Sequence, residues 1–400
     1  MSGAATSPTE EALHADVAAL AALDRLPCSP GEAEAAAWIA ERLAATGARV
    51  VVDDELVHGT YFTPLGILSA LAAAGGVAVL RGHRRLGGVA AGVAAAGIWQ
   101  DLTGGRRRAL RRVLKRRQTT NVVAEIGPRD AERTLVVHAH HDAARTSFIF
   151  DETVARFMVE RFPAVMERTD RWPPLMGVVW GAPAAVAVSA LTGGRRTAAV
   201  GTVFAAGTAA LMAHMIRQPV VPGANDNLSG VAVLLAVARR LQDDPPPPGV
   251  RVILLSAGAE EANQEGMLAF ARRHFGELDA ERTSFLCLDT VGSPELVLIE
   301  GEGFLRMYEY PSRQKERVAA AAREAGVHVR RGIRFTFATD GLVSLRRGYE
   351  VATLGSVTEH LVPANYHWPT DTAANVDYGS VARCVEVVLG TIARTGGDGV

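Results

Sequence analysis

The sequence predicts an α/β protein with a mixed, mostly parallel sheet flanked by helices, into which two transmembrane helical hairpins are inserted. Two observations support this prediction. Short apolar segments typical of strands alternate with amphipathic helical segments over most of the 400 residues, which favours a sheet covered on both faces. In two places this alternation gives way to long uncharged segments, and hydrophobic residues make up 48% of the chain.

The first 60 residues have the pattern of two helices followed by a strand. Residues 10–26 carry leucine and valine at helical spacing. A second helix is predicted to begin at the sequence Ser-Pro-Gly-Glu, residues 29–32, and to end at Gly47. Residues 50–52 are then predicted to form a strand.

Two pairs of apolar segments follow, and we assign them to transmembrane hairpins at 61–105 and 171–216. A helix needs about 20 apolar residues to cross a bilayer. The second segment is short, and the third contains Pro183. The alternative is a set of buried helices, rich in alanine and glycine, in a soluble protein. The four segments are 62–80, 86–100, 174–192 and 197–216.

A basic segment at 106–117 follows the first hairpin and contains eight arginine and lysine residues. We predict a juxtamembrane helix that binds anionic lipid, and the alternatives are a solvated basic face or a nucleic-acid site. The positive-inside rule then places the chain outside the hairpins in the cytoplasm, as part of a multi-pass protein of the cell membrane. The net charge of −1 gives no reason to expect nucleic acid as a partner, and the three cysteines form no disulfide framework.

The remaining segments complete one discontinuous domain built from residues 1–60, 118–170 and 217–400. Its predicted strands are 121–126, 134–137, 250–255, 284–288, 295–299, 327–329 and 350–354. Its predicted helices are 145–170, 228–241, 262–274, 312–325 and 377–394.

Polar side chains gather where these strands end, and this is where open α/β sheets place their sites. Taken singly, each of these side chains can be explained without a functional site, as a helix cap, a strand-end histidine or a solvated glutamate pair. Together, histidines and carboxylates form a donor set that suits zinc. The set comprises His140 and Asp142, Asp226 in a turn before a helix, Glu260 and Glu261, Asp289, and His367.

The order of these motifs resembles the M28 family of co-catalytic zinc peptidases. The motifs are His-x-Asp, Gly-x-Asn-Asp-Asn-x-Ser-Gly, Glu-Glu, Leu-Asp-x-Val-Gly and Tyr-His-x-x-x-Asp-Thr. The resemblance covers the chain outside the hairpins and implies a zinc exopeptidase fold. It also implies a site with two zinc ions, one held by His140, Asp226 and Asp289, the other by Asp226, Glu261 and His367.

The resemblance implies roles for the neighbouring residues as well. Glu260 would be the general base, and Asp142 would hold the other ring nitrogen of His140. His138 is the alternative to His140 as a ligand, because several histidines crowd this motif. The resemblance further implies a cis peptide bond between Asp226 and Asn227.

These features predict a membrane-anchored di-zinc aminopeptidase that acts on short peptides. Carboxypeptidase activity, or glutaminyl cyclisation by a one-zinc site, is the enzymatic alternative. A membrane receptor or scaffold built on the same fold is the non-enzymatic one. The sequence does not predict the peptide that is cleaved or the oligomeric state.

Overall fold

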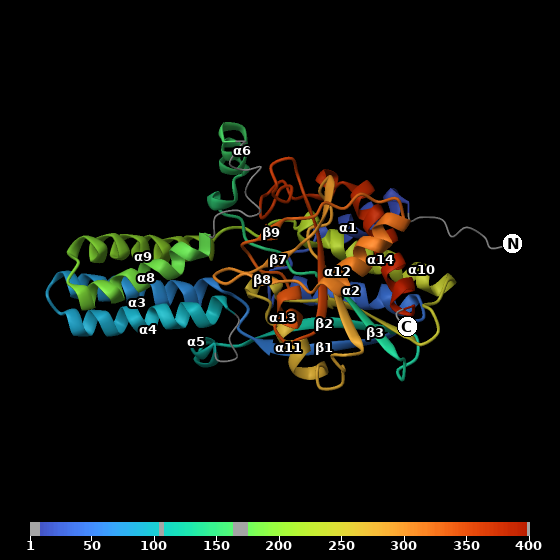
Figure 1. Cartoon of the computed structure of the whole chain (residues 1–400), viewed down its shortest axis with the longest axis horizontal. Helices are drawn as coiled ribbons and strands as arrows, with labels where there is room; N and C mark the ends of the chain where they lie inside the picture. Colours follow the sequence, from blue (N-terminus) through green and yellow to red (C-terminus); the bar gives the residue numbers. More distant parts are fainter. Residues whose placement is uncertain (1–8, 104–107, 163–174, 398–400) are drawn as a thin grey trace.

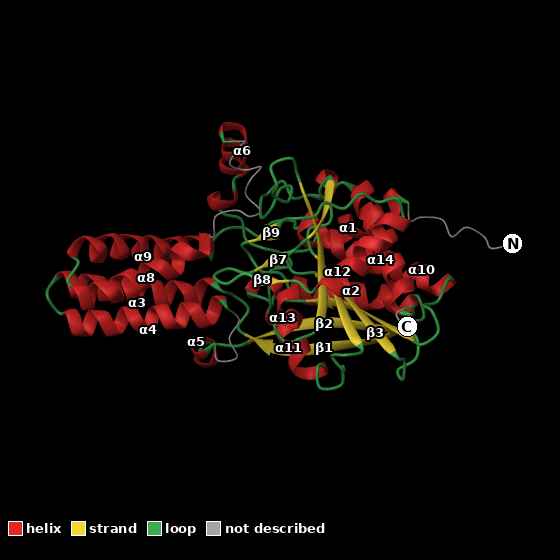
Figure 2. Ribbon diagram, viewed as in Figure 1, coloured by secondary structure: helices red, strands yellow, loops and turns green. Residues whose placement is uncertain are grey.

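A seven-stranded sheet forms the centre of the α/β domain in the computed structural model, which describes residues 9–103, 108–162 and 175–397 (Figure 2). Its strands follow the order β1-β2-β4-β3-β5-β10-β6. The four inner strands β4, β3, β5 and β10 run parallel, whereas β1, β2 and β6 pair antiparallel at the edges. The predicted mixed, mostly parallel sheet is therefore confirmed, and its parallel pairs lie at the centre. The strands are β1 (Arg49–Val57), β2 (Arg117–Ile126), β3 (Arg133–His140), β4 (Val250–Ala257), β5 (Thr283–Leu288), β6 (Glu295–Leu298) and β10 (Glu350–Val357).

Helices cover both faces of this sheet. Consecutive strand residues such as Val122 and Val123 belong to two different hydrophobic clusters, because successive side chains of a strand point to opposite faces of the sheet. One cluster packs against α1 (Glu10–Ala21), α2 (Pro30–Ala45), α10 (Ser229–Asp243), α12 (Ser312–Glu324) and α14 (Tyr378–Thr395). The other packs against α11 (Glu265–His274) and α13 (Gly341–Leu345), near the small sheet of β7 (Gly301–Glu302), β8 (Tyr308–Glu309) and β9 (Arg334–Phe335).

The two predicted hairpins pack together as one four-helix bundle, which projects from one side of the α/β domain (Figure 1). Glycines allow the close contacts within it, because a Cβ at Gly75 would lie 2.8 Å from the Gly87 carbonyl oxygen. Large apolar side chains, including Leu86, Val203 and Phe204, are exposed on its outside. The helices are α3 (Phe62–Leu80), α4 (Arg84–Leu102), α8 (Leu175–Thr192) and α9 (Arg195–Met215). Of these, α3, α8 and α9 are long and apolar enough to cross a membrane.

Three predicted elements differ from the structure. The basic helix predicted at 106–117 is reduced to α5 (Ala109–Val113), since the chain becomes extended and enters β2 at Arg117; residues 106 and 107 lie outside the described part. The strand predicted at 327–329 is irregular, and only Arg330 forms a bridge to the sheet. The helix predicted at 145–170 begins late, as a 3-10 turn at Phe148–Phe150 and then α6 (Glu152–Arg161). The reason is that Arg145 forms a bridge with Val220 and the Thr146 amide donates to the Pro219 carbonyl oxygen, so this part of the chain is extended. Residues 163–174, which include the end of that prediction and the start of the second hairpin, lie outside the described part.

Candidate metal centre

The parallel strands bring the predicted site residues to one edge of the sheet. His140 is the last residue of β3, and the 3-10 turn Glu260–Ala262 follows β4. Asp289 comes directly after β5, and His367 lies in the loop after β10. Because β3, β4, β5 and β10 are parallel, their carboxyl ends meet, and residues separated by more than 200 positions lie together.

Asp226 lies at the centre of this group and uses its two oxygens on opposite sides. Its Oδ1 lies 3.2 Å from Nε2 of His140, and its Oδ2 lies 3.0 Å from Nε2 of His367. The same His367 nitrogen is 3.0 Å from Oε1 of Glu261. Potential ligand atoms of His140, Asp226 and Glu261 all lie within 4.8 Å of one another.

The donor set fits zinc, which binds imidazole nitrogen and carboxylate oxygen. Asp226 is only 3% exposed, and its Oδ2, although 3.0 Å from Nε2 of His367, accepts no hydrogen bond in the described chain, so it is a buried acceptor that a cation would satisfy. Asp289 is also buried but is not one of the three residues grouped most closely. Burial and the charge of Asp226 raise the pKa of Asp289 to about 7, as expected where several carboxylates share a site.

Asp142 connects two parts of the site. Its Oδ1 lies 3.4 Å from Nδ1 of His140 and accepts a hydrogen bond from the Glu260 amide at 3.0 Å. Its Oδ2 accepts one from the Glu261 amide at 2.9 Å. Asp142 therefore directs Nε2 of His140 toward Asp226 and also fixes the turn that carries both glutamates.

The turn around Asp226 is fixed by its two neighbouring asparagines. Asn227 Oδ1 accepts hydrogen bonds from the Gly230 and Thr290 amides at 3.3 and 3.1 Å, so Asn227 joins the first turn of α10 to the loop after β5. Asn225 Oδ1 accepts from the Gly292 amide at 2.8 Å. The peptide bond between Asp226 and Asn227 is cis, as the resemblance implied. Asn227, and not Asp226, thus bonds the amide in the first turn of α10, and the Asp226 carboxylate is available for the site.

His138 takes no part in this group. It is completely buried on β3, and its ring meets the edge of Phe285 at a centroid distance of 6.1 Å. Burial lowers the pKa of His138 to about 3, so its imidazole is neutral in the core. Of the two histidines considered, the structure brings His140 to Asp226.

Sequence reasoning missed three residues that hold the site in place. Asp371 accepts hydrogen bonds from the amides of Asn225 at 2.7 Å and Asp226 at 3.1 Å; its place in the Tyr-His-x-x-x-Asp-Thr motif was the available signal. Glu32, at the predicted helix start, accepts from the Ala259 amide at 2.8 Å, directly before the glutamate pair.

Arg25 is the third missed residue, and it carries no sequence signal. It is completely buried and donates to the carbonyl oxygens of His141 at 2.8 Å and Pro222 at 2.7 Å. It thereby ties the segment that follows His140 to the turn that contains Asp226.

Glu260 lies among several other acidic groups. Burial raises its pKa well above the ordinary value; the charge of His140 opposes this, while Asp340, Glu261 and Asp289 add to it. A carboxylate with a raised pKa is a stronger base near neutral pH, which suits proton transfer.

Aromatic side chains border the site on the side of the bundle. Tyr366 stacks on His367 with ring centroids 4.0 Å apart, and Phe150 meets His367 edge-on at 4.5 Å. Phe150 also packs against the hydrophobic cluster at the base of the bundle, together with Tyr61 at the start of α3. The site therefore lies between the sheet edge and the bundle.

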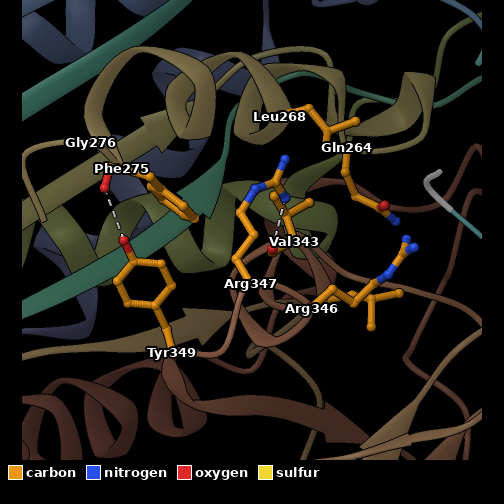
Figure 3. Close-up of a pocket in the computed structure, with 9 residues that line it drawn as sticks. Gln264, Leu268, Phe275, Gly276, Val343, Arg346, Arg347 and Tyr349 are labelled. Carbon is orange, nitrogen blue, oxygen red and sulfur yellow. Dashed lines mark hydrogen bonds between the residues drawn. The ribbon is translucent and has the colours of Figure 1, made fainter. Parts of the chain in front are cut away.

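A separate cleft of about 600 Å³ lies between α11 and α13 (Figure 3). Gln264, Arg346 and Arg347 line it, and the Tyr349 hydroxyl donates to the Phe275 carbonyl oxygen at 3.3 Å. None of the predicted ligands is among its described lining residues. The cleft and the candidate metal centre are therefore different sites, although Gln264 follows the glutamate turn.

The chain was compared with known proteins. Residues 202–392 match the family model of Peptidase family M28. This segment is slightly less than half of the chain and contains Asp226, both glutamates, Asp289 and His367. Among curated proteins, no match was found.

Solved structures with the same fold include zinc exopeptidases. A leucine aminopeptidase precursor from Bacteroides thetaiotaomicron is 14% identical, with a TM-score of 0.58 over 98% of this chain and 99% of that one. A Zn-dependent exopeptidase from Parabacteroides distasonis is 13% identical, with a TM-score of 0.55 over 98% and 99%. A glutaminyl cyclase from Bacteroides thetaiotaomicron is 15% identical, with a TM-score of 0.58 over 97% and 99%. The fold is thus that of the zinc exopeptidases, and the family match supports a zinc metallopeptidase.

Proposed function

We propose that the protein is a membrane-anchored di-zinc aminopeptidase that hydrolyses short peptides. The observation that carries this proposal is the position of Asp226, whose two oxygens face two different histidines. A carboxylate in this position can bridge two cations. His140, Asp226 and Asp289 would hold one zinc ion, and Asp226, Glu261 and His367 the other.

Glu260 would act as the general base. When bound, zinc supplies Lewis-acid activation of a water and of the scissile carbonyl. Glu260 takes a proton from the attacking water at its carboxylate and returns it to the leaving amine. Asp142 keeps Glu260 in place through its backbone amide and keeps His140 in the correct orientation. The adjacent carboxylates would also attract the positively charged amino end of a peptide.

The bundle would anchor this domain in a bilayer. Three of its helices have the necessary length and composition, and apolar side chains cover its outer surface. Both hairpins begin and end at the α/β domain, so the domain would lie on one side of the membrane (Figure 1). Exposed Arg112, Lys115 and Arg116 at this end favour the cytoplasmic side and contact with anionic lipid.

Two of the five arginines at the opposite end of the bundle, Arg84 and Arg195, have a structural role there, whereas the exposed Arg81, Arg85 and Arg196 count against this topology. Arg84 donates to the carbonyl oxygens of Ala190 at 2.9 Å and Leu191 at 2.8 Å. Arg195 donates to the Leu80 carbonyl oxygen at 3.0 Å. These arginines bind carbonyls at helix C-termini, which explains their presence without a role in orientation.

A glutaminyl cyclase is the second candidate. Asp289 lies outside the group formed by His140, Asp226 and Glu261. A site with one zinc would use Asp226, Glu261 and His367, since Nε2 of His367 lies 3.0 Å from each of the two carboxylates. Solved glutaminyl cyclases also share the fold.

Metal analysis and substrate specificity would separate these functions. Detergent-purified protein should contain two zinc ions per chain, release nitroaniline from aminoacyl-nitroanilides and leave N-blocked peptides intact. Equal cleavage of blocked and free peptides would overturn the aminopeptidase proposal. One zinc per chain, with conversion of N-terminal glutamine to pyroglutamate, would establish the cyclase instead. Protein without zinc or activity would be a receptor or scaffold.

A further inference from the structure

A buried ion cluster lies outside the candidate metal centre, and we call Asp101, Arg111 and Glu265 the hairpin clasp. Nε and Nη2 of Arg111 donate to Oδ1 and Oδ2 of Asp101 at 2.7 and 2.8 Å. Nη1 of Arg111 lies 3.0 Å from Oε1 of Glu265. The three residues are 3–7% exposed, so water screens these interactions little.

The clasp joins both ends of the first hairpin. Asp101 lies in the last turn of α4. Glu265 Oε2 accepts hydrogen bonds from the amides of His58 at 2.8 Å and Gly59 at 2.6 Å, directly before α3. Because Glu265 begins α11, which packs on the sheet, the clasp fastens this hairpin to the α/β domain.

The same residues hold the backbone of the turn that carries the glutamate pair. Nη1 of Arg111 donates to the Ala262 carbonyl oxygen at 2.7 Å, and Nη1 of Arg108 donates to that of Asn263 at 2.9 Å. Asn263 Nδ2 in turn donates to the Asp101 carbonyl oxygen at 3.2 Å. Each of these bonds connects residues 262 and 263 to the segment that leaves the first hairpin.

This turn needs support from outside, because its backbone is strained. Ala259, Asn263 and Gln264 have φ values of 48°, 74° and 60°, in the left-handed region that non-glycine residues seldom adopt. Such conformations persist where surrounding contacts determine them. Glu260 and Glu261 lie between these strained positions, so their placement depends on the contacts at each end of the turn.

We propose that Arg111 is a positioning residue through which the first hairpin sets the geometry of Glu260 and Glu261. The effect on catalysis rests on the proposed peptidase function, whereas the effect on the turn does not. Without Arg111, Asp101 and Glu265 would be buried without the guanidinium that pairs with both, and the turn at 259–265 would relax. Glu260 would then lie out of line with its substrate, and Glu261 would be less well placed to hold zinc.

The test uses the full-length chain in detergent and the substitution Arg111→Met. We expect kcat to fall by about 100-fold, the loss that a small misplacement of catalytic groups can cause. KM should change by less than about threefold, because peptide binding does not involve Arg111. Hydrogen exchange of amides 259–265 should become faster, and a chelator should remove zinc more quickly.

Two further variants serve as a conservative substitution and as a control. Arg111→Lys keeps the charge but cannot reproduce the planar guanidinium contacts, so its kcat should be intermediate. Arg251→Met is the matched control, because Arg251 pairs with Glu125 at 2.6 Å in a partly buried position at the start of β4, away from the glutamate turn. This control should keep the parent kcat and the parent exchange at 259–265.

Parent-like exchange at 259–265 in folded Arg111→Met would overturn the proposal, as would a loss of kcat no greater than in Arg251→Met. If Arg111→Met does not fold, Asp101→Asn replaces it, since it keeps the side-chain shape and the backbone acceptor while removing one charge. Asp101→Asn should show the same changes at smaller size, and parent-like exchange would again overturn the proposal. If the parent hydrolyses no peptide, the proposed function fails, while the exchange measurement still decides the positioning role.

Discussion

The candidate metal centre and the hairpin clasp are both buried charge clusters, but their charges balance differently. In the clasp, the Arg111 guanidinium pairs directly with Asp101 and Glu265, and the charge of Arg108 also acts on Asp101, so two cations face two carboxylates. In the metal centre, carboxylates outnumber the histidines that face them, since His140 lies beside Asp142 and Asp226, and His367 lies beside Asp226 and Glu261.

The pKa values reflect this difference. Burial alone would lower the pKa of Arg111, but Asp101 and Glu265 raise it above its ordinary value, so the clasp stays charged. In the metal centre, burial and neighbouring acids raise the pKa values of Asp289 and Glu260. A complete ion cluster fixes structure, whereas an acid-rich one favours a cation from solution. The predictions below test whether the metal centre differs from the clasp in this way.

The largest effect is expected for Glu260→Gln. This change keeps the shape of the side chain but removes the base, so kcat should fall by about 100- to 10,000-fold while zinc remains bound. In the parent, activity should fall as the pH falls through the pKa of Glu260, because only the ionised carboxylate accepts a proton. Steady-state kinetics and metal analysis check both points; the exposed Glu359→Gln is the control. Parent-like kcat in zinc-loaded Glu260→Gln would exclude this mechanism.

Asp226→Asn should weaken zinc binding more than any other single change in the cluster. An amide cannot bridge two cations as a carboxylate does, and zinc affinity should fall by more than about 100-fold, since loss of an outer partner alone costs about 10- to 100-fold. Titration with zinc in a chelator buffer measures the change. Two tightly bound zinc ions in this variant would show that Asp226 is not the bridge.

Asp371→Asn should have a smaller effect, because Asp371 acts through the backbone of the Asp226 turn. The Asp371 carboxylate accepts hydrogen bonds from two backbone N–H groups. In the asparagine variant, the side-chain NH2 group would lie beside one of these two donors and could not accept its hydrogen bond. We expect zinc affinity to fall by about 10- to 100-fold, as for other residues that orient a ligand. Asp377→Asn, at the cap of α14, is the control for a general loss of stability. Equal zinc affinity in Asp371→Asn and the parent would contradict this role.

The smallest effect concerns stability without zinc. Asp289 has a pKa of about 7 in the folded chain, against an ordinary 3.8, so the folded state binds more protons between these values. The free energy of unfolding of the zinc-free protein should therefore fall as the pH rises from about 4 to 7. Denaturant titrations at several pH values measure this trend, which zinc or Asp289→Asn should reduce. If the free energy of unfolding fell equally with pH in the presence and absence of zinc, zinc would not bind near Asp289, and the difference from the clasp would be wrong.

The sequence predicted well those features that follow from the periodicity of apolar residues and from the position of polar residues after predicted strands. Alternating apolar strands and helices predicted the sheet, and the position of His140, Glu260, Asp289 and His367 after strands placed them at one edge, because parallel strands end together. Regions with mixed signals were predicted less well. The arginines at 106–117 suggested a lipid-binding helix, but Arg111 is buried in the clasp, where one of its partners, Glu265, is distant in sequence.

By itself, the sequence determined the α/β class, the two hairpins and the residue types of the site. The periodicity of apolar residues and the order of the motifs can both be read without knowing which residues are in contact. Only the tertiary structure decided that His140 rather than His138 faces Asp226, that Asn227 accepts a hydrogen bond from the distant Thr290 amide, and that Arg25 and Asp371 fix the two sides of the site. It also decided that the hairpins form one bundle fastened beside the glutamate turn. These features depend on contacts between residues far apart in the chain, and such contacts leave no periodic pattern.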